Sequence, residues 1–314
     1  MAYQQTVEPH HKLIFSNNVR NRAQQMKNPL ADAVMVEPCD GEAKDVADLI
    51  GALEYQEGED YGQRNPENVP DRSRRWLVRP RVIESGQTIT KEEKFDQAMD
   101  PAARLHDTHI KAVRRGQFDR ILGVRKIGGV FKISGNGILG EANEGKTPGG
   151  TMPLPSENFL AADYGDTGTP YGMGLKKLRA ATEAMELEEF GLETDQEVYG
   201  LITPKQKTDL LTLAFETGKN LNPFDVENIR DGKPGKLLGV NWMFTNRLPI
   251  DENGYRLCPL WCKDNIIAGE WQPLEGTMWN QTEKKNLPYI YVDAYLTASR
   301  IEDGGVRVLR CAEN

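Results

Sequence analysis

The sequence predicts an α+β protein, and three features support this assignment. A long amphipathic helix is expected from Pro101 to about Leu122, and further helices begin near Leu175 and Pro204. After the third helix the chain consists mostly of strand and turn patterns, and the clearest strands lie at its end. No internal repeat interrupts this order. We therefore expect a protein that combines helices with sheets.

Composition limits the class of protein further. The chain has 314 residues, of which 38% are hydrophobic, enough for one large or two linked domains. Its apolar runs are too short to span a bilayer, and the first residues do not resemble a signal peptide. Four cysteines are too few for a disulfide framework and suit a reducing compartment. A net charge of −8 argues against a protein whose main function is to bind nucleic acid tightly. An acidic chain can nevertheless form the wall of a compartment that holds DNA.

The long helix has the strongest local signals. Asp100 and Pro101 supply an N-cap and a first turn, and Gly123 ends the helix. A separate short helix is expected after Thr90, which has a capping-box partner in Glu93. The face expected to be covered carries Leu105, His109, Ala112, Val113 and Gly116, and the exposed face carries Asp107, Lys111, Arg114 and Arg115.

The sequence also contains signals for a second and a third helix. Leu175, Leu178, Ala181 and Met185 form an apolar stripe that stops before Gly191. The third helix has Thr203 as its cap and Gln206 as the capping-box partner. A further amphipathic helix is expected between residues 9 and 26, where Phe15 and Val19 belong to its apolar face.

Strand patterns occupy much of the remaining chain. They are expected at residues 31–38, 74–85, 197–203, 237–244 and 255–262, with Pro80 confining the second to an edge or an arm. The glycine-rich residues 123–174 predict loops with one hairpin. At the end of the chain, residues 289–300 alternate apolar and polar side chains, and the turn at residues 302–305 leads into 306–311. These last two segments are predicted to form an antiparallel pair.

The most polar part of the chain extends from Glu54 to Arg75. Such a segment buries too little apolar area to fold alone, so it is either a disordered loop or an arm that another molecule orders. Its charge changes sign along its length, from Glu54, Glu57, Glu59 and Asp60 to Arg64, Arg72, Arg74 and Arg75.

The stretch GEANEGKT, from Gly140 to Thr147, matches the phosphate-binding pattern G-x-x-x-x-G-K-[ST]. That pattern requires a helix directly after the loop, because the free N–H groups of the helix hold the phosphate. Here PGGTMPLP follows Thr147, and its prolines and glycines predict no helix. Glu141 and Glu144 would also repel phosphates. We interpret the stretch as a glycine-rich surface loop.

Other catalytic or metal-binding patterns are weak. His106 and His109 lie one helical turn apart without a nearby third ligand, so a structural or solvated role is expected. Cys258 and Cys262 have no second Cys or His pair at zinc-site spacing. The sequence contains neither G-x-S-x-G nor H-E-x-x-H. We therefore expect no catalytic residues, no metal site and no cofactor.

Six stretches in this order resemble the major capsid proteins of tailed bacteriophages with the Hong Kong 97-type fold. They are NVRNRAQQMKNPLADAVMVEPCDGE, the charged insert up to RRWLVRP, ITKEEKFDQAMDPAARLHDTHIKAVRRGQFDRILG, LKKLRAATEAME with VYGLITPKQKTDLL, GKPGKLLGVNWMFTNRLP, and VDAYLTASRIEDGGVRVLRCAEN. The resemblance covers nearly the whole chain. It implies a Hong Kong 97-like fold with an N-terminal arm, an extended loop, a long spine helix, a peripheral domain and an axial domain.

The resemblance also implies boundaries for these parts. Residues 1–40 would form the N-terminal arm and residues 41–85 the extended loop, a β-hairpin arm. Residues 86–150 would hold the spine helix and peripheral domain, residues 151–280 the axial domain, and residues 281–314 the strands that return to the peripheral domain. Because this pattern begins within about ten residues of Met1, no cleaved N-terminal scaffolding domain is expected.

The function that the resemblance implies is mechanical, with no enzymatic activity. Copies of the chain would form hexamers and pentamers and close an icosahedral capsid around double-stranded DNA, which they would contact weakly and without specificity. Other partners would be a portal and scaffold or decoration proteins, with no membrane, in a virion assembled in the bacterial host cytoplasm. Candidate residues between subunits are Phe15, Val19, Glu54, Glu57, Glu59, Asp60, Arg64, Arg72, Arg74, Arg75 and Trp76.

Three alternatives predict different behaviour. A tail-tube or decoration subunit would also lack a catalytic site, but should lack a long helix directly after a charged arm. A nucleotide-binding enzyme would need Lys146 for turnover. A lectin-like binding module would be a monomer or a small oligomer. A lysine–asparagine cross-link, known in some capsid relatives, has no identifying motif here.

Overall fold

The computed structural model describes residues 28–50, 69–70, 72–90, 101–165, 168–191, 196–216, 236–237 and 239–313. The helices expected at residues 9–26 and after Thr90 lie outside these residues, as does most of the charged segment. The chain divides into two compact units. Among the described residues, unit 1 contains Val82–Gly116 and Leu274–Ala294, and unit 2 contains the rest. The five-part division expected from the resemblance stays a proposal.

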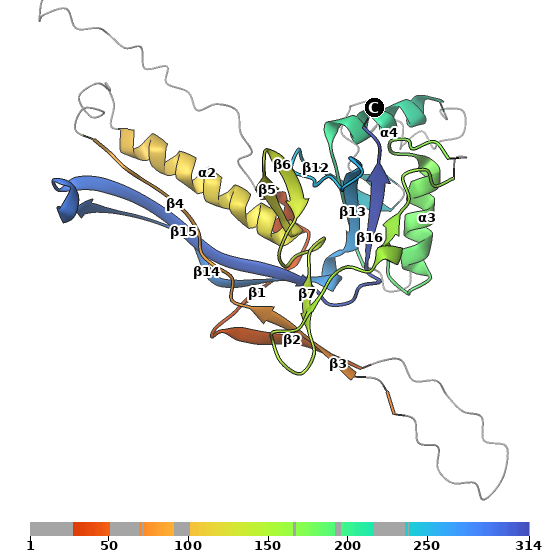
Figure 1. Ribbon diagram of the computed structural model, residues 1–314, viewed down its shortest axis with the longest axis horizontal. Helices are drawn as coiled ribbons and strands as arrows, with labels where there is room; N and C mark the ends of the chain where they lie inside the picture. The colour runs from red at the N-terminus through yellow and green to blue at the C-terminus, as the bar shows by residue number, and fades with distance from the viewer. Residues whose placement is uncertain are drawn as a thin grey trace, which may run out of the picture. The chain divides into compact units, whose positions relative to one another are not determined.

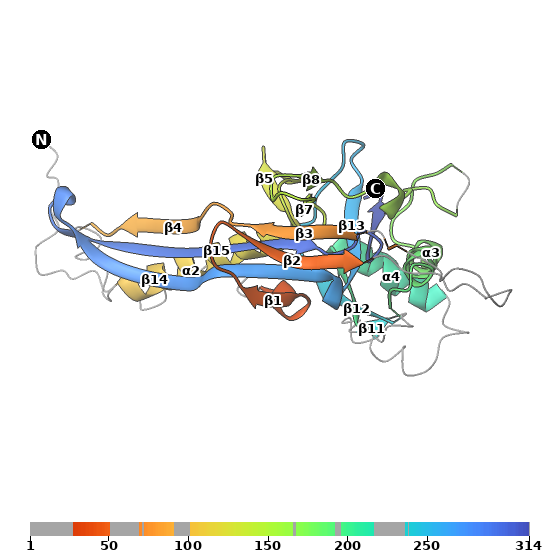
Figure 2. The same cartoon turned by 90° about the horizontal axis from the view of Figure 1, so that it is seen from below.

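Unit 1 combines a helix with a sheet. The helix is the part of α2 (Pro101–Leu122) up to Gly116, and the strands are β4 (Ile83–Thr88), the end of β14 (Ile266–Gln281) and the start of β15 (Leu287–Arg300). β4 pairs antiparallel with β15, from Tyr289 opposite Thr88 to Ala294 opposite Ile83. α2 lies along this sheet (Figures 1 and 2). The fully buried apolar residues here are Ile89, Val113, Ile290, Val292 and Ala294.

The helix and the sheet of unit 1 are in close contact. A Cβ atom at Gly116 would lie 2.4 Å from Cγ2 of Ile83, so only glycine permits this approach of α2 to β4. The predicted helix bounds are confirmed, but the predicted exposure of Lys111 is wrong. Lys111 is buried and forms an ion pair with Asp107, because its alkyl stem packs on the protein while the carboxylate accepts the ammonium.

Unit 2 contains most of the strands. A six-stranded sheet has the order β11-β12-β10-β13-β16-β9, a four-stranded sheet has the order β2-β3-β7-β8, and β5 pairs with β6. The start of β14 pairs parallel with β1. The bounds are β1 Met35–Pro38, β2 Ala43–Ile50, β3 Arg72–Val78, β5 Val124–Ile127, β6 Val130–Ile133, β7 Ala142–Glu144, β8 Thr151–Met152, β9 Phe159–Leu160, β10 Val198–Ile202, β11 Lys236–Leu237, β12 Val240–Phe244, β13 Arg256–Cys262 and β16 Val306–Cys311.

Two helices belong to unit 2, α3 (Leu175–Glu186) and α4 (Pro204–Glu216). The predicted stripe of α3 is confirmed, since Leu178, Ala181 and Met185 are buried in the main core. That core also contains Trp261, whose indole N–H donates to the carbonyl of Ala33 over 2.9 Å. Four short 3-10 helices complete the described structure: η1 Pro29–Asp32, η2 Ser156–Asn158, η3 Lys263–Asn265 and η4 Thr282–Lys284.

Lys177 lies on the buried side of α3 and is fully enclosed. Its ammonium shares its three N–H groups among four backbone carbonyl oxygens, those of Ala162, Tyr171, Gly172 and Arg310, at 2.6, 2.7, 3.1 and 3.1 Å. Burial lowers the pKa of Lys177, although these oxygens and the Tyr171 ring at 3.8 Å favour the charged form. One side chain thereby joins α3 to β16 and to the loop before α3.

Two strand predictions are wrong. The last two segments do not pair with each other, because β15 pairs with β4 and β14, whereas β16 pairs with β13 and β9. The strand predicted at residues 74–85 is two strands in different sheets, β3 and β4. Pro80 lies between them and has no N–H to donate to either sheet. The buried alternation predicted for β15 is nevertheless confirmed at Ile290, Val292 and Ala294.

Other elements differ less from expectation. The glycine-rich region contains two hairpins, β5–β6 and β7–β8, instead of one. Gly123 ends α2 with a φ of +75°, as predicted. The predicted strand at residues 31–38 is shortened by η1, and that at 237–244 begins at Val240. The residue patterns predicted neither β2 nor the long strand β14, although the resemblance implied a β-hairpin arm at residues 41–85.

The C-terminus of unit 2 is held by a network of charged and polar side chains. Glu313 accepts from Arg256 over 3.0 and 2.6 Å and from Gln206 over 3.1 Å. The carbonyl oxygen of the Gln206 amide accepts from the Thr203 backbone N–H, which confirms the predicted capping box of α4. Hydrogen bonds from Arg256, Gln206 and Thr203 lower the pKa of Glu313 despite its partial burial.

This network predicts acid sensitivity. The pKa of Glu313 is lower in the folded protein than in the unfolded chain, so its contribution to stability is present above the unfolded value of 4.5. That contribution is lost as the pH falls through the folded pKa. Glu313→Gln should lower stability at pH 7 and weaken its decline below pH ~4.5. Urea denaturation measured from pH 3 to 7 tests this, and an unchanged pH profile contradicts it.

Candidate functional site

The β2–β3 hairpin in unit 2 carries the described part of the charged segment. Asp48 on β2 lies directly opposite Arg74 on β3, and the two side chains form a two-point ion pair, with Nη2 of Arg74 2.8 Å from Oδ2 of Asp48. The guanidinium also lies 5.4 Å from the ring centre of Trp76. The hydrogen bond from Arg74 lowers the pKa of Asp48. Because both charges are exposed to solvent, the pair fixes geometry more than it stabilises the fold.

Arg75 points to the other side of β3, as alternation along a strand requires. It is only 5% exposed. Its guanidinium donates to the carbonyl of Ile301 over 2.8 Å, to Glu144 over 3.0 Å and to Asp303 over 3.3 Å. The side chain of Arg75 thus connects β3 to β7 and to the turn before β16.

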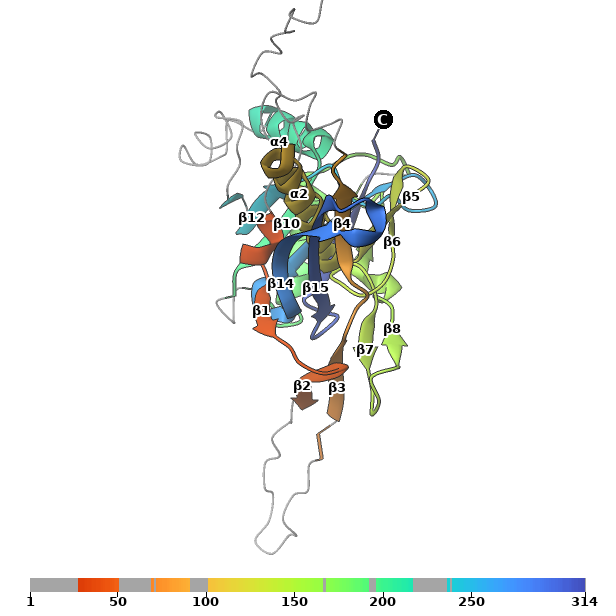
Figure 3. The same cartoon turned by 90° about the vertical axis from the view of Figure 1, so that its left-hand side faces the viewer.

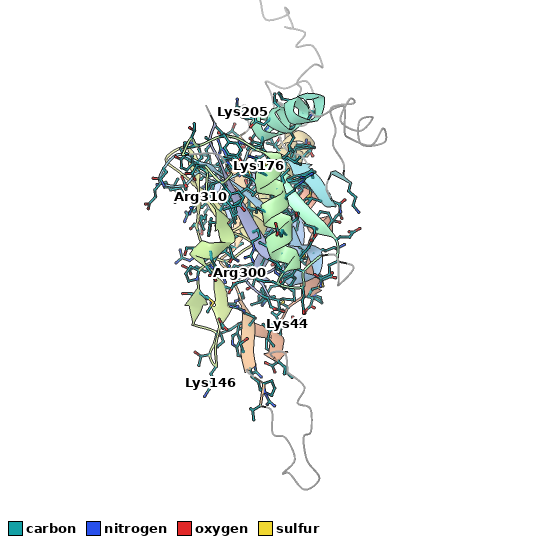
Figure 4. The ribbon with its side chains drawn as sticks, turned by 90° about the vertical axis from the view of Figure 1, so that its right-hand side faces the viewer. Lys44, Lys146, Lys176, Lys205, Arg300 and Arg310 are labelled. Atoms are coloured by element: carbon teal, nitrogen blue, oxygen red, sulfur yellow. The ribbon has the colours of Figure 1, made fainter. Side chains whose placement is uncertain are left out.

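A second arginine also donates to Asp303. Arg300, which is fully buried, donates to Asp303 and to the carbonyls of Gly140 and Met152, the latter over 2.8 Å. The side-chain amide of Asn158 donates to the backbone carbonyl of Asp303 over 2.6 Å. Two buried cations therefore share one carboxylate at the base of the hairpin, where Figure 4 shows Arg300 in the interior of the protein.

The stretch GEANEGKT contains β7 and the first residues of the turn that leads to β8. The interpretation as a surface loop is therefore only partly right, because Ala142 and Asn143 are buried in the strand while Lys146 and Thr147 are exposed. The local backbone geometry explains why glycine occupies both glycine positions of the pattern. A Cβ atom at Gly140 would lie 1.9 Å from the carbonyl oxygen of Gly135, and Gly145 has a φ of +110°. Within the described residues, the next helical element is the short η2, which begins at Ser156. The arrangement of strand, loop and helix N-terminus that holds phosphate does not occur here.

This turn is fixed to the β2–β3 hairpin. The indole N–H of Trp76 donates to the carbonyl of Gly145 over 2.8 Å, and the Gly145 N–H donates to the carbonyl of Arg74 over 3.1 Å. β3 and β7 also pair as strands. Figures 3 and 4 show the two hairpins side by side, with Lys146 at the end of β7–β8.

An open groove of about 760 Å³ lies between the two hairpins. Within the described part of the chain, Arg72 and Lys146 form no hydrogen bond or ion pair there, while Asp48 and Glu144 are paired with other arginines. The groove is therefore cationic in character. Its lining residues are Asp48, Leu49, Ile50, Arg72, Ser73, Arg74, Glu144, Gly145 and Lys146.

The structure separates the candidate interface residues into three groups. Arg72, Arg74 and Trp76 lie on the hairpin with part of each side chain accessible. Arg75 is buried and forms its ion pairs inside the protein, so its side chain is not exposed as an interface residue would be. The others lie outside the described residues: Phe15, Val19, Glu54, Glu57, Glu59, Asp60 and Arg64.

The histidines and cysteines show no arrangement for metal binding among the described residues, where no three His, Cys, Asp or Glu side chains converge. His109 forms a 2.8 Å hydrogen bond with Ser85, and burial lowers its pKa. All four cysteines are buried free thiols, and burial raises the pKa of Cys262 to about 12. No helix in the described part of the chain is long and apolar enough to cross a membrane.

Sequence reasoning did not find Asp303, Arg300 or Lys177. Asp303 looked like a turn residue, and Arg300 like the polar end of a strand. The only available signal was Lys177 beside Leu178, a charge next to an apolar stripe. Such a signal does not distinguish a buried ammonium from one that reaches solvent.

Comparisons with known proteins agree with this fold. The family described as phage capsid protein matches residues 7–313. No curated protein matches the sequence. Similar solved structures include the capsid of the cyanophage P-SCSP1u, with 11% identity over 97% of this chain and 94% of that one and a TM-score of 0.67. The capsid of the Myoviridae phage XM1 has 12% identity, coverage of 95% and 96%, and a TM-score of 0.65.

A third similar structure is the capsid of a native GTA particle, with 13% identity over 95% of this chain and 94% of that one and a TM-score of 0.62. The fold is therefore the Hong Kong 97-like capsid fold. The chain belongs to the phage capsid protein family, because the family match covers nearly its whole length. It is accordingly a structural capsid protein.

The shared carboxylate at the hairpin base predicts a large effect on stability. Asp303→Asn removes the charge that Arg75 and Arg300 share, leaving two buried cations less well compensated. We expect the free energy of unfolding to fall by about 3 kcal/mol. Urea denaturation of the unassembled subunit measures this change.

Asp264→Asn provides a matched control, because Asp264 is exposed and forms no described ion pair. It should change the free energy of unfolding by less than ~0.5 kcal/mol. Equal effects of the two substitutions would show that the shared carboxylate has no special importance.

Proposed function

We propose that copies of this chain assemble as hexamers and pentamers into an icosahedral shell that encloses phage double-stranded DNA. The observation that carries this proposal is the family match to residues 7–313, together with solved capsids that cover both chains almost entirely. The chain would assemble in the bacterial host cytoplasm, with a portal and with scaffold or decoration proteins as further partners. The proposed role is mechanical and involves no catalysis.

The β2–β3 hairpin supports the mechanical part of the proposal. A contact arm transmits force only if its base cannot rotate, and this base is held by Arg75, by Trp76 and by pairing with β7. The hairpin would lie at the base of the extended loop, residues 41–85. The outward side chains Arg72, Arg74 and Trp76 would then contact a neighbouring subunit. A shell repeats each weak contact many times, so individually small energies suffice.

The remaining candidates belong to the same proposal. Phe15 and Val19 would contact neighbours from the N-terminal arm, residues 1–40, and the acidic half of the loop would pair with basic patches on adjacent subunits. Residues 86–150 would form the spine helix and peripheral domain, residues 151–280 the axial domain, and residues 281–314 the returning strands. The net charge of −8 favours only weak, non-specific contact with enclosed DNA.

Electron microscopy tests the proposal directly. Negative-stain images of the purified protein, with light scattering for particle mass, should show closed shells or rings of five and six subunits. The protein should be examined alone and after co-expression with a candidate scaffold. A uniform small species under both conditions would contradict the proposal.

A further inference from the structure

The β5–β6 hairpin of unit 2 has an outward face whose only charges are positive. Arg125 on β5 lies directly opposite Lys132 on β6, and both side chains are exposed. Neither forms an ion pair within the described part of the chain. Like charges in directly opposite positions destabilise a pair of strands, and an anion beside them would remove this repulsion. Ile127 and Val130 lie on the same face and are 50% and 40% exposed.

The opposite face of the hairpin packs on the protein. Val124 is buried in the main core, and Phe131 packs against that core. The centre of the Phe131 ring lies 5.9 Å from the ammonium of Lys126 and 4.8 Å from the guanidinium of Arg247. The carbonyl of Phe131 accepts from the N–H of Ile250 over 3.1 Å. These contacts fix the direction in which the outward face points.

Two further arginines lie beside Arg125. Arg120, in the last turn of α2, donates to the backbone carbonyl of Arg81 over 3.3 Å. Burial lowers the pKa of Arg120, and the positive charges of Arg125 and Arg81 lower it further. The carboxylate next to Arg120 in the sequence, Asp119, accepts from Arg247 over 2.6 Å. None of the three arginines forms an ion pair with another described residue.

Four cations without a carboxylate partner indicate that this surface binds an anion. The hairpin ends in Gly128 and Gly129, and a Cβ atom at either position would meet no atom within 4 Å. The tip therefore extends into open space, where its backbone can approach a ligand closely.

Double-stranded DNA fits this surface better than an acidic peptide does. A two-stranded β-ribbon can enter the major groove of DNA, and the phosphates carry one charge per ~1.7 Å of helix axis. Several phosphates can therefore reach the closely spaced cations at once. Side chains along an extended peptide alternate in direction, so only every second carboxylate would face the hairpin.

We propose that the outward face of the β5–β6 hairpin, with Arg81 and Arg120 beside it, binds the phosphodiester backbone of the double-stranded DNA inside the shell. This inference rests on the proposed function, because it assumes a shell that encloses DNA. Phosphate contacts carry no sequence information, so the binding is non-specific. The cationic surface is local, and the net charge of −8 over the whole chain keeps the affinity low.

Removal of the two outward cations tests the contact on the unassembled subunit. Fluorescence anisotropy of a short labelled duplex, measured over a range of salt concentrations, gives the affinity and its salt dependence. Arg125→Gln combined with Lys132→Gln should weaken binding at low salt at least ~10-fold and reduce the slope of log K against log salt by about 2. The loss should be equal on duplexes of different sequence. Circular dichroism verifies that the variant is folded, and an unchanged slope would overturn the proposal.

Lys284→Gln combined with Lys285→Gln is the matched control, because it removes the same charge from an exposed segment of unit 1. It should bind the duplex like the wild type. Equal losses in the two double variants would overturn the proposal, because total charge and not the hairpin would then govern binding. Poly-glutamate of the same net charge as the duplex should compete weakly. Equal competition would overturn the assignment of DNA in favour of an acidic protein.

Acylation of lysines tests the contact inside assembled particles. An amine-reactive ester modifies an exposed lysine more readily than one that a phosphate covers. Lys132 should therefore react several-fold more slowly in DNA-filled particles than in empty ones, whereas Lys284 should react equally in both. Equal rates for Lys132 would overturn the contact while the proposed function stands. If no particles that enclose DNA form, the proposed function fails, and the anisotropy measurement still decides whether the hairpin binds DNA.

Discussion

One carboxylate joins the β2–β3 hairpin to the rest of unit 2. Asp303 accepts from Arg75 on β3 and from Arg300 at the end of β15, so residues more than 200 positions apart along the chain meet at one charge. Arg300 is fully buried and Arg75 almost fully, and neither guanidinium can lose its proton. Movement of β3 away from this base would separate Arg75 from Asp303, Glu144 and the carbonyl of Ile301. The carbonyls of Ile301, Gly140 and Met152 complete the enclosure.

Much of the secondary structure could be predicted from the sequence because its signals are local. The long helix has Pro101 in its first turn and Gly123 at its end, and the α4 capping box is formed within four residues. Strand partners depend on distant segments. β15 and β16 are separated by a short turn, yet each pairs with strands from elsewhere. Alternation in β15 indicated which side chains are buried, but no local pattern indicates the neighbouring strand.

In the candidate site, too, local features could be predicted from the sequence and contacts between distant segments could not. Arg74 and Arg75 are adjacent and chemically identical, yet one lies outside beside Trp76 and the other is buried against Glu144. Alternation predicts that they differ, but not which of them points inward. The sequence indicated that this segment is charged and that no helix directly follows GEANEGKT. It could not reveal that Gly145 accepts a hydrogen bond from Trp76, because the two residues lie far apart along the chain.

The buried ammonium of Lys177 makes one connection inside the subunit insensitive to salt. Four carbonyl oxygens around an ammonium resemble the oxygen cage that binds a free monovalent metal ion, but here the cation is covalently attached. It cannot be exchanged for sodium or potassium, and its burial protects it from screening. Changes in ionic strength therefore act on the exposed Asp48–Arg74 pair and leave this internal connection intact. Salt can therefore weaken this ion pair in the exposed hairpin while Lys177 keeps α3 joined to β16.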